Sequence, residues 1–368
     1  MMITANNGFI EQSERYAFDN AGESLKKYIL LQKGELAYNH GASKLRPFGS
    51  CFALTTAESA RIPFVYHCFS AENQNAEFLS IELNGSEVES QLRKIVSSGA
   101  RMDGLLNISF DEYSTVTVLL PDIKEQEHIA DFFRNLDHLI TLHQRKYDKL
   151  QVLKKAMLEK MFPKNGSSVP EIRFKGFTDA WEQRKLGEIA VFSKGVGYSK
   201  NDLCEEGTPI ILYGRLYTKY ETCIFDVDTF VKEKAGSVYS KGGEVIVPAS
   251  GETAEDISIA SVVVKPGILL GGDLNIVSPT AEYDSAFLAL TISSGATHKY
   301  LSSLAQGKSV VHLHNSDIQS VSAKFPTKRE QEKIHLIFGK IDTLITLHQR
   351  ELEKLQNIKK SMLEKMFV

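Results

Sequence analysis

The chain has 368 residues, of which 42% are hydrophobic and 24% charged, with a mean hydropathy of −0.18. This is ordinary globular composition, sufficient for two or three domains. The formal net charge is −3 at pH 7, whereas nucleic-acid-binding proteins are usually basic overall. Any DNA-binding surface must therefore be local or completed by a partner.

No apolar run approaches the length of a membrane span, and the first residues, MMITANNGFIEQ, do not have the pattern of a signal peptide. The four cysteines are widely spread and form no C-x-x-C pair. They are Cys51, Cys68, Cys204 and Cys223. We expect reduced thiols in a cytoplasmic protein.

Residues 1–121 mix strand and helix patterns. KYILLQKGELAYNHG predicts a strand, a turn at Lys33-Gly34 and a second strand. AEFLSIELNGSEVESQLRKIVSSGA predicts a helix interrupted near Asn84-Gly85, followed by a loop. YSTVTVLLP alternates β-branched and apolar residues up to Pro121, which predicts a strand leading into a long helix.

The segment 125–162 returns as 330–367, at a constant offset of 205, with 24 identities in 38 positions. Each copy is rich in Leu, Lys, Glu and Gln, and Gly339 is the only Gly or Pro in either. We therefore predict two long helices, over 122–162 and 327–368.

Apolar residues recur on a heptad in both copies, which requires burial against another helix. The predicted a positions are Ile129, Leu136, His143, Leu150 and Met157, and Ile334, Ile341, His348, Leu355 and Met362. The predicted d positions are Phe132, Leu139, Lys146, Leu153 and Lys160, and Ile337, Leu344, Glu351, Ile358 and Lys365.

The two helices are expected to pair with each other, antiparallel, in a register where paired residue numbers sum to 494. Leu139 then meets Leu355, and His143 meets Glu351 in a central polar layer that fixes the register. The histidines are interpreted as polar core residues rather than ligands. Cysteines at 139 and 355 should then crosslink, and those at 139 and 344 should not.

Residues 163–170, PKNGSSVP, are a predicted linker, and residues 171–326 repeat the plan of the first half. SKGGEVIVPASG parallels QKGELAYNHGAS, and DSAFLALTISSG parallels NAEFLSIELNGS. The second half has 72 residues between Glu171 and Gly243, whereas 33 residues precede Gly34. We therefore expect the first globular half to be incomplete at its N-terminus, without a counterpart of PEIRFKGFTDAWEQRKLGEIAVFSKG.

No catalytic motif stands out. Gly307-Lys308-Ser309 lacks the upstream Gly of a phosphate-binding loop, and there is no G-x-G-x-x-G after a strand, no H-E-x-x-H and no zinc spacing. No N/D-P-P-F/Y occurs, the sequence with which amino-methyltransferases hold a flipped adenine. Pro121-Asp122 with Glu125 and Glu127 is better explained by the acidic first turn of a helix than by a nuclease. A duplicated module without catalytic residues favours a bipartite DNA reader.

At this point the residues resemble a known family. KFPTKREQEKIHLIFGKIDTLITLHQRELEKLQNIKKSMLEKMF and its twin from LLPDIKEQEHI look like the conserved helical regions of Type I restriction-modification specificity (S) subunits. FTDAWEQRKLGEIAVFSKG resembles the start of a target recognition domain of that family, and KGGEVIVPASG and QKGELAYN resemble a strand within it. The resemblance covers essentially the whole chain.

The resemblance implies an α+β fold: a tandem duplication of a mixed α/β target recognition domain and a long helix, the helices pairing as an antiparallel coiled coil. The domains would be 1–121 and 171–326, each reading half of an asymmetric bipartite DNA target, with the helices setting the spacing. The subunit would be non-catalytic. Two methyltransferase (M) subunits would methylate adenine with S-adenosylmethionine, and restriction (R) subunits would use ATP and Mg.

Candidate DNA contacts are polar and aromatic residues on predicted loops, because base edges and phosphates need donors and acceptors. In the second half they are Lys194, Tyr198, Lys200, Tyr213, Arg215, Tyr217, Lys219, Lys308, His312, His314 and Asn315. In the first half they are His40, Lys44, Arg46, Arg101 and Asn107. Arg215 is favoured, because bidentate Arg to guanine is the commonest specific contact. The alternative for each is a solvated loop residue, and for Tyr198 and Tyr213 a core position.

Lysines on the predicted non-seam helix faces could dock M, or be a solvated surface. They are Lys149, Lys154, Lys155 and Lys160, and Lys354, Lys359, Lys360 and Lys365. Two other functions stay open. One is a truncated or regulatory S-like protein that binds M without full target recognition. The other, an enzyme in its own right, is disfavoured by the absent motifs.

Overall fold

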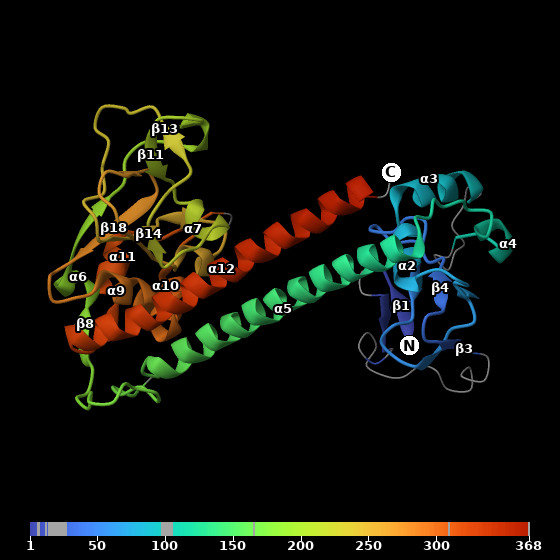
Figure 1. Cartoon of the computed structure of the whole chain (residues 1–368). Helices are drawn as coiled ribbons and strands as arrows, with labels where there is room; N and C mark the ends of the chain where they lie inside the picture. The colour runs from blue at the N-terminus through green and yellow to red at the C-terminus, as the bar shows by residue number, and fades with distance from the viewer. Residues whose placement is uncertain are drawn as a thin grey trace. The chain divides into compact units, whose positions relative to one another are not determined.

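The computed structural model describes residues 1–5, 8–11, 13, 28–96, 106–164, 166–307 and 310–366. They divide into two compact units: residues 1–143 with 351–368, and residues 144–350. The long helices α5 (Ile123–Met161) and α12 (Lys328–Met366) each contribute to both units. Figure 1 shows each as one uninterrupted helix. No helix in the described ranges is long and apolar enough to cross a membrane.

The first unit is built on short antiparallel strands. Its pairings are β1 (Met2–Thr4) with β2 (Gly8–Ile10), β3 (Ile29–Gln32) with β6 (Ser59–Ile62), and β4 (Leu36–Asn39) with both β5 (Ser50–Ala53) and β7 (His67–Phe69). Alternation along β4 places Leu36 and Tyr38 in one apolar cluster and Ala37 in another. The predicted strands around Lys33-Gly34 are confirmed, although they pair with other strands and not with each other.

The helix predicted after β7 is confirmed with its interruption. It forms α2 (Ala76–Glu82) and α3 (Ser86–Ile95). Asn84 lies in the break, where its side chain accepts from the Cys51 N–H at 3.1 Å and donates to the Cys51 carbonyl. The break therefore ties the helices to β5.

The strand predicted over YSTVTVLLP is wrong. Tyr113 ends the short helix α4 (Phe110–Tyr113), and residues 116–122 belong to no strand. A β-branched segment has strand propensity, but a strand needs a neighbouring chain for its hydrogen bonds. Among the described residues, no strand pairs with residues 116–121.

The second unit contains a five-stranded sheet in the order β12-β16-β14-β18-β9. These strands are Cys223–Ile224, Ser261–Val263, Glu244–Pro248, Leu274–Pro279 and Ala190–Lys194. β14 is buried along its length, with Val245 and Val247 on one side and Ile246 on the other. The helix α9 (Ser285–Ile292) is buried on every side from Ala286 to Ile292, as expected for a predominantly apolar helix inside the core.

Smaller elements complete this unit. Its further strands are β8 (Glu182–Lys185), β10 (Leu203–Cys204), β11 (Thr208–Ile211), β13 (Phe230–Val231), β15 (Ser250–Gly251), β17 (Leu269–Leu270), β19 (Val311–His312) and β20 (Ser322–Phe325). Its further helices are α6 (Leu186–Ile189), η2 (Lys200–Asp202), α7 (Arg215–Thr218), α8 (Ala254–Ile257), α10 (Gly295–Leu304) and α11 (Asn315–Ser320). β10, β13, β11 and β17 form a second sheet, while β15 pairs with β19 and β20 with β8.

The repeat positions Gln126 and Gln331 make the same contacts in their separate units. Gln126 accepts from the Asn75 N–H at 3.0 Å and donates to the Pro121 carbonyl at 2.9 Å. Gln331 accepts from the Asp284 N–H at 2.9 Å and donates to the Pro326 carbonyl at 2.8 Å. Since Asn75 and Asp284 are the N-caps of α2 and α9, each glutamine ties a long helix to a core helix.

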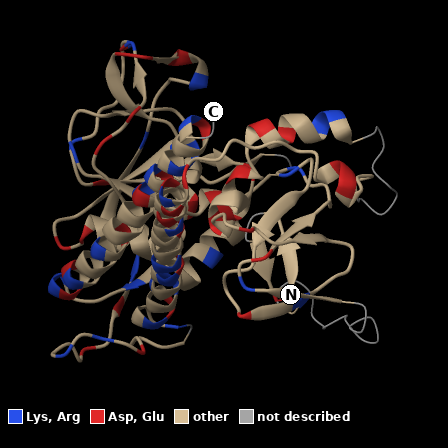
Figure 2. Ribbon diagram, turned by 45° about the vertical axis from the view of Figure 1, so that its right-hand side comes forward, with Lys and Arg blue, Asp and Glu red and all other residues tan. Residues whose placement is uncertain are grey.

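Contacts between α5 and α12 occur within each unit. Lys359 lies 2.5 Å from Asp137 in the first unit, and Lys154 lies 2.5 Å from Asp342 in the second. Both pairs have residue numbers that sum to 496, which is consistent with antiparallel helices. Figure 2 shows charges of both signs along the helices.

The predicted a positions lie in the buried or half-buried stripe of each helix. Of the predicted d positions, Ile337, Glu351 and Ile358 are half-buried, but the others are exposed and the prediction is wrong for them. Leu139, Leu153 and Leu344 are 42%, 46% and 44% exposed. The stripe instead continues four residues after most of the a positions, through Phe133 and Met161 in α5 and Phe338, Ile345 and Leu352 in α12. Apolar residues stand at both the third and the fourth position after several a positions, as in Phe132-Phe133 and Leu344-Ile345, so the sequence does not separate the two frames. Lys154 and Lys359, which were predicted to lie on the free faces of the helices, instead form ion pairs between α5 and α12.

Candidate nucleic-acid interface

Five candidate residues of the second unit share one local surface. Asn315 donates to the carbonyl of Ser193 at 2.9 Å, which places it beside Lys194 at the end of β9. His312 pairs with Ser250 in the β15–β19 ladder, and the Ser250 carbonyl accepts a 2.5 Å hydrogen bond from Tyr217. His314 lies between them at the N-cap of α11. We call Lys194, Tyr217, His312, His314 and Asn315 the β9–β19 cluster.

A buried asparagine holds the loop of the β9–β19 cluster. Asn275 is fully buried on β18, and its amide donates to the carbonyl of Leu313 at 2.8 Å. The Leu313 N–H donates in turn to the Ala249 carbonyl at 3.0 Å. These contacts fix the backbone and leave the His312 and His314 side chains exposed. The carboxamide oxygen of Asn315 is a buried acceptor without a partner in the described ranges.

Glycines bring the turn after β9 against the turn before β18. A Cβ on Gly195 would lie 1.9 Å from the Gly271 oxygen, and one on Gly272 would lie 2.7 Å from the Gly197 oxygen. Only residues without a side chain allow this approach. The turn ends at Tyr198, whose φ of +56° is unusual for a residue with a side chain.

Tyr198 and Lys200 lie near the second sheet of this unit. The Tyr198 hydroxyl lies 2.6 Å from the Ser237 hydroxyl and accepts from the Lys234 N–H at 2.7 Å. The Lys234 ammonium lies over the Tyr198 ring, 5.0 Å from its centroid. Lys200 is exposed. Sequence reasoning missed Lys234, because its association with Tyr198 spans 36 residues.

The guanidinium of Arg215 is used in ion pairs and a hydrogen bond within the protein. Its guanidinium donates to Glu221 at 2.7 Å, Asp228 at 2.9 Å and the Asp226 carbonyl at 3.1 Å, and its side chain is 8% exposed. In this arrangement it cannot offer two free donors to a guanine. Lys219 also pairs with Asp228, at 2.9 Å, but remains half exposed.

The two tyrosines flanking Arg215 have largely structural positions. Tyr213 packs against the core cluster that contains Ile211 and Leu216, and its ring meets that of Tyr217 edge-on, with centroids 5.9 Å apart. Burial raises the pKa of Tyr217 well above its ordinary value. At neutral pH its phenol is therefore a donor, directed to the protein backbone.

Of the first-unit candidates, two are engaged with the backbone and two are exposed. His40 is 8% exposed with Nδ1 3.1 Å from the Leu106 oxygen, and Arg46 donates to the Asn84 carbonyl at 2.7 Å. Burial lowers the pKa of Arg46. Lys44 and Asn107 lie at the surface. Arg101, like Lys308 of the second unit, lies outside the described residues.

The described residues include no group of three or more His, Cys, Asp or Glu side chains placed to hold a metal ion. The exposed Lys194 ammonium and the imidazoles of His312 and His314 in the β9–β19 cluster can donate to phosphates or base edges. The chemistry that this surface supports is binding.

The sequence is similar to known DNA specificity proteins. Residues 178–357 match the model of the Type I restriction modification DNA specificity domain. The Type I restriction enzyme MjaVIII specificity subunit of Methanocaldococcus jannaschii is 22% identical over 298 residues, which cover 78% of this chain and 67% of that protein.

Two solved structures extend the comparison. The S subunit of a Type I restriction-modification system from M. genitalium is 14% identical, with a TM-score of 0.53 over 93% of this chain and 85% of that chain. The HsdS subunit from Thermoanaerobacter tengcongensis is 15% identical, with a TM-score of 0.44 over 92% of this chain and 81% of that chain.

The chain is thus a protein of mixed helix and strand whose residues 178–357 match a DNA specificity domain. Just under half of the chain thus matches a Type I specificity domain, and over most of its length the chain is similar to a Type I restriction enzyme specificity subunit, the family that the repeated helical sequence resembles.

Proposed function

We propose that the chain is the sequence-reading subunit of a Type I restriction-modification complex and binds a bipartite, asymmetric DNA target. Each unit would read one half of the target. The main support is the specificity-domain match at residues 178–357, together with a repeated helix that makes equivalent glutamine contacts in each unit.

The two long helices would pair as an antiparallel coiled coil that sets the spacing between the half-sites. The pairs Lys359–Asp137 and Lys154–Asp342 support this, because they are the same residues of the repeat, displaced by 205. Such a duplication would give the subunit two similar surfaces for two M subunits. The exposed lysines Lys149, Lys155 and Lys360 could contact them.

The subunit itself would be non-catalytic and would hold no cofactor. S-adenosylmethionine, ATP and Mg would belong to the M and R partners, which methylate adenine and restrict DNA. In the second unit the β9–β19 cluster is the best candidate for DNA contact, since it combines exposed donors with a backbone held by Asn275.

Genome-wide mapping of adenine methylation tests this function. The chain would be co-expressed with its M subunit in a host that lacks other adenine methylation. We expect a bipartite motif with a fixed gap, and His312→Ala, which removes an exposed imidazole of the β9–β19 cluster, should relax one half of the motif while leaving the other. A motif unrelated to the chain, or one unchanged when residues 178–357 are exchanged for another specificity domain, contradicts the proposal.

A second candidate is a truncated or regulatory S-like protein that binds M without full target recognition. It is favoured by one observation: no strand in the described part of the first unit pairs with residues 116–121, whereas β20 in the second unit pairs with β8. M that co-purifies with the chain without any methylation would support this candidate. Methylation at a single half-site would mean that only the second unit reads DNA.

A further inference from the structure

In the second unit, one residue of the sheet holds the loop that carries His312 and His314. Asn275 pairs with Val247 in the β18–β14 ladder, and its amide donates to the Leu313 carbonyl at 2.8 Å. Leu313 is fully buried, whereas the histidines on either side of it are exposed. Successive side chains of an extended segment point to opposite sides, so burying Leu313 turns both histidines outward.

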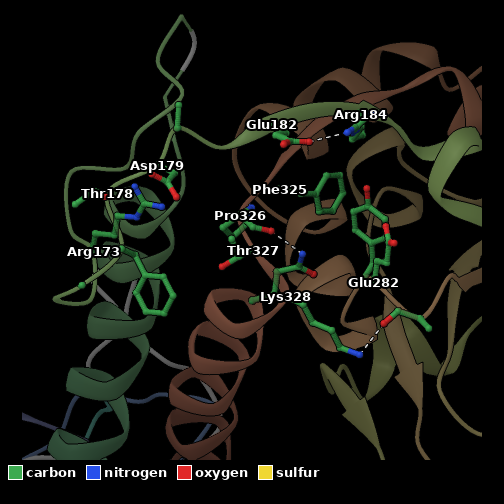
Figure 3. Close-up of a pocket in the computed structure, with 16 residues that line it drawn as sticks. Arg173, Thr178, Asp179, Glu182, Arg184, Glu282, Phe325, Pro326, Thr327 and Lys328 are labelled. Atoms are coloured by element: carbon green, nitrogen blue, oxygen red, sulfur yellow. Dashed lines mark hydrogen bonds and ion pairs between the residues drawn. The ribbon is translucent and has the colours of Figure 1, made fainter.

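A pocket of about 500 Å³ in the same unit does not include this loop. It lies at the start of α12, and none of the described residues that line it belongs to the β9–β19 cluster (Figure 3). Two arginines of its lining are paired with carboxylates, Arg173 with Glu330 and Arg184 with Glu182, each at 2.7 Å. Because these donors are already held by carboxylates, the loop remains the candidate contact surface of this unit.

The first unit has the same pairing of strands. β4 is antiparallel to β7, as β14 is to β18. Aligning QKGELAYN with KGGEVIVPASG at their shared Gly-Glu makes Tyr38 the counterpart of Val247. Tyr38 pairs with His67, and Val247 pairs with Asn275. His67 therefore occupies the sheet position in the first unit that Asn275 occupies in the second.

His67 also makes the contact that Asn275 makes. Its Nε2 lies 3.1 Å from the Ile108 carbonyl oxygen, and because a carbonyl oxygen only accepts, Nε2 is the donor. Ile108 corresponds to Leu313 at the offset of 205 that relates the two long helices. Two different side chains at one sheet position thus bind the same backbone carbonyl, each in its own unit.

The segment around Ile108 has the form of the loop in the second unit. Ile108 is 5% exposed, whereas Asn107 and Ser109 on either side of it are exposed. Ser109 is the N-cap of α4, as His314 is the N-cap of α11. Asn107 therefore stands where His312 stands in the second unit.

Two side chains of this segment are exposed and have the chemistry to read bases. Asn107 presents a carboxamide, which can donate to N7 and O6-type edges only through its NH₂ but matches adenine with donor and acceptor together. Phe110 is 41% exposed, with its ring centroid 5.7 Å from that of His67, and an apolar ring suits the methyl group of thymine. The Ser109 hydroxyl, by contrast, is bonded to Glu112 within the protein. The segment therefore suits an A·T pair.

Granted the function proposed above, on which this inference rests, we propose that residues 107–110 form the DNA-reading loop of the first unit. Asn107 contacts an adenine edge in the half-site that this unit reads. His67 is a positioning residue, which binds the Ile108 carbonyl and acts on DNA only through the loop. Because that hydrogen bond fixes the backbone one residue after Asn107, its loss displaces the reading side chain without removing it.

Methylation mapping of the full chain with its M subunit tests the loop. The half of the motif read by the second unit is identified by exchanging residues 178–357. In the other half, Asn107→Ala should lower the preference for adenine at one position roughly 5- to 10-fold. Ser59→Ala is a control that should change neither half, since Ser59 is exposed on β6, which pairs with β3.

The outcomes separate this loop from the function on which it rests. If Asn107→Ala leaves the motif unchanged, alters the half that belongs to the second unit, or acts no differently from Ser59→Ala, the loop is assigned wrongly while the proposed function stands. If the unaltered chain directs no bipartite motif, the proposed function fails and the loop assignment fails with it.

Two substitutions at His67 separate positioning from folding. His67→Gln keeps a donor at about the reach of Nε2, whereas His67→Met has a similar length without a donor. His67→Met should lower the same adenine preference roughly 5-fold, and His67→Gln should restore most of it. Adding Asn107→Ala to His67→Met should lower it no further than Asn107→Ala alone. Equal losses for Met and Gln, or an unchanged motif for His67→Met, would overturn the role of His67.

Discussion

Glu330 and Glu125 occupy the same position of the repeat in different surroundings. The Glu330 carboxylate is fully buried and receives two hydrogen bonds from Arg173, whereas Glu125 is exposed. A buried carboxylate is stable only while it is paired, since water no longer solvates it. The same residue type should therefore contribute very differently to the stability of its unit.

Glu330→Gln should lower the free energy of unfolding of the second unit by about 2–3 kcal/mol. The loss lies at the lower end for a buried pair because Arg173 still reaches solvent. Urea denaturation followed by tryptophan fluorescence measures it. The matched variant Glu125→Gln should change stability by less than about 0.5 kcal/mol, and equal losses would contradict the assignment.

Asp284 and Asn75 cap equivalent helices with different chemistry. Asp284 accepts from the Phe287 N–H at 2.8 Å and lies 2.8 Å from His335, and Asn75 accepts from the Phe78 N–H at 2.9 Å. Burial raises the pKa of Asp284, but the hydrogen bonds from His335 and the Phe287 N–H outweigh it, so the pKa lies below its ordinary value. Asn75 does not titrate.

The cost of removing the two caps should therefore differ in its pH dependence. Asp284→Ala should cost about 1–2 kcal/mol at pH 7. Because the folded pKa is depressed, this stabilisation is present above the unfolded pKa and is lost as pH falls below about 4 toward the folded value. Asn75→Ala should cost about 1 kcal/mol at either pH. Denaturation of both variants at pH 7 and pH 3.5 distinguishes them, and a pH-independent loss for Asp284→Ala would refute the linkage.

In the long helices, the local sequence determines that a helix forms, but not which face of it is buried. Helix hydrogen bonds are internal, so α5 and α12 form wherever good helix formers run without Pro. Which stripe is buried depends on the partner. The structure buries Phe133, Phe338 and Ile345, and exposes Leu139 and Leu344.

A disulfide scan measures that stripe directly. Ile140 and Leu355 are half-buried seam positions of the first unit, and their numbers sum to 495, close to the 496 of the ion pairs. Ile140→Cys with Leu355→Cys should crosslink faster than Leu139→Cys with Leu355→Cys, because residue 139 points away from the seam. Single-cysteine variants control for the four native thiols. Equal rates would mean that the seam includes Leu139.

At the scale of the molecule, the two units differ in how much sheet and buried apolar core stabilises them. The second unit has a five-stranded sheet, a buried apolar helix and the β8–β20 ladder. The first unit has sheets of two or three strands among its described residues and exposes Leu119 and Leu120. Fewer buried apolar contacts imply lower local stability.

Unfolding of the whole chain should therefore occur in two steps. Trp181, the single tryptophan, reports on the second unit, whereas far-ultraviolet circular dichroism reports on both. The dichroism transition should begin at lower urea than the fluorescence transition. Asn75→Ala should shift only the early step, and coincident transitions would contradict independent stabilities.

Local chemistry in the sequence determined the repeat, the two long helices, the break at Asn84 and the strands beside Lys33-Gly34. Each depends on residues near one another in the chain, as turns, caps and helices do. Three features depend on the tertiary structure: which heptad positions of the long helices are buried, whether residues 116–121 form a strand, and whether the Arg215 side chain is free to bind. The β-branched run has no strand partner among the residues that the structure describes, and Arg215 pairs with carboxylates that follow it by six and thirteen residues. A helix closes its own hydrogen bonds, but a strand and a charged side chain take their state from the partner that the fold provides.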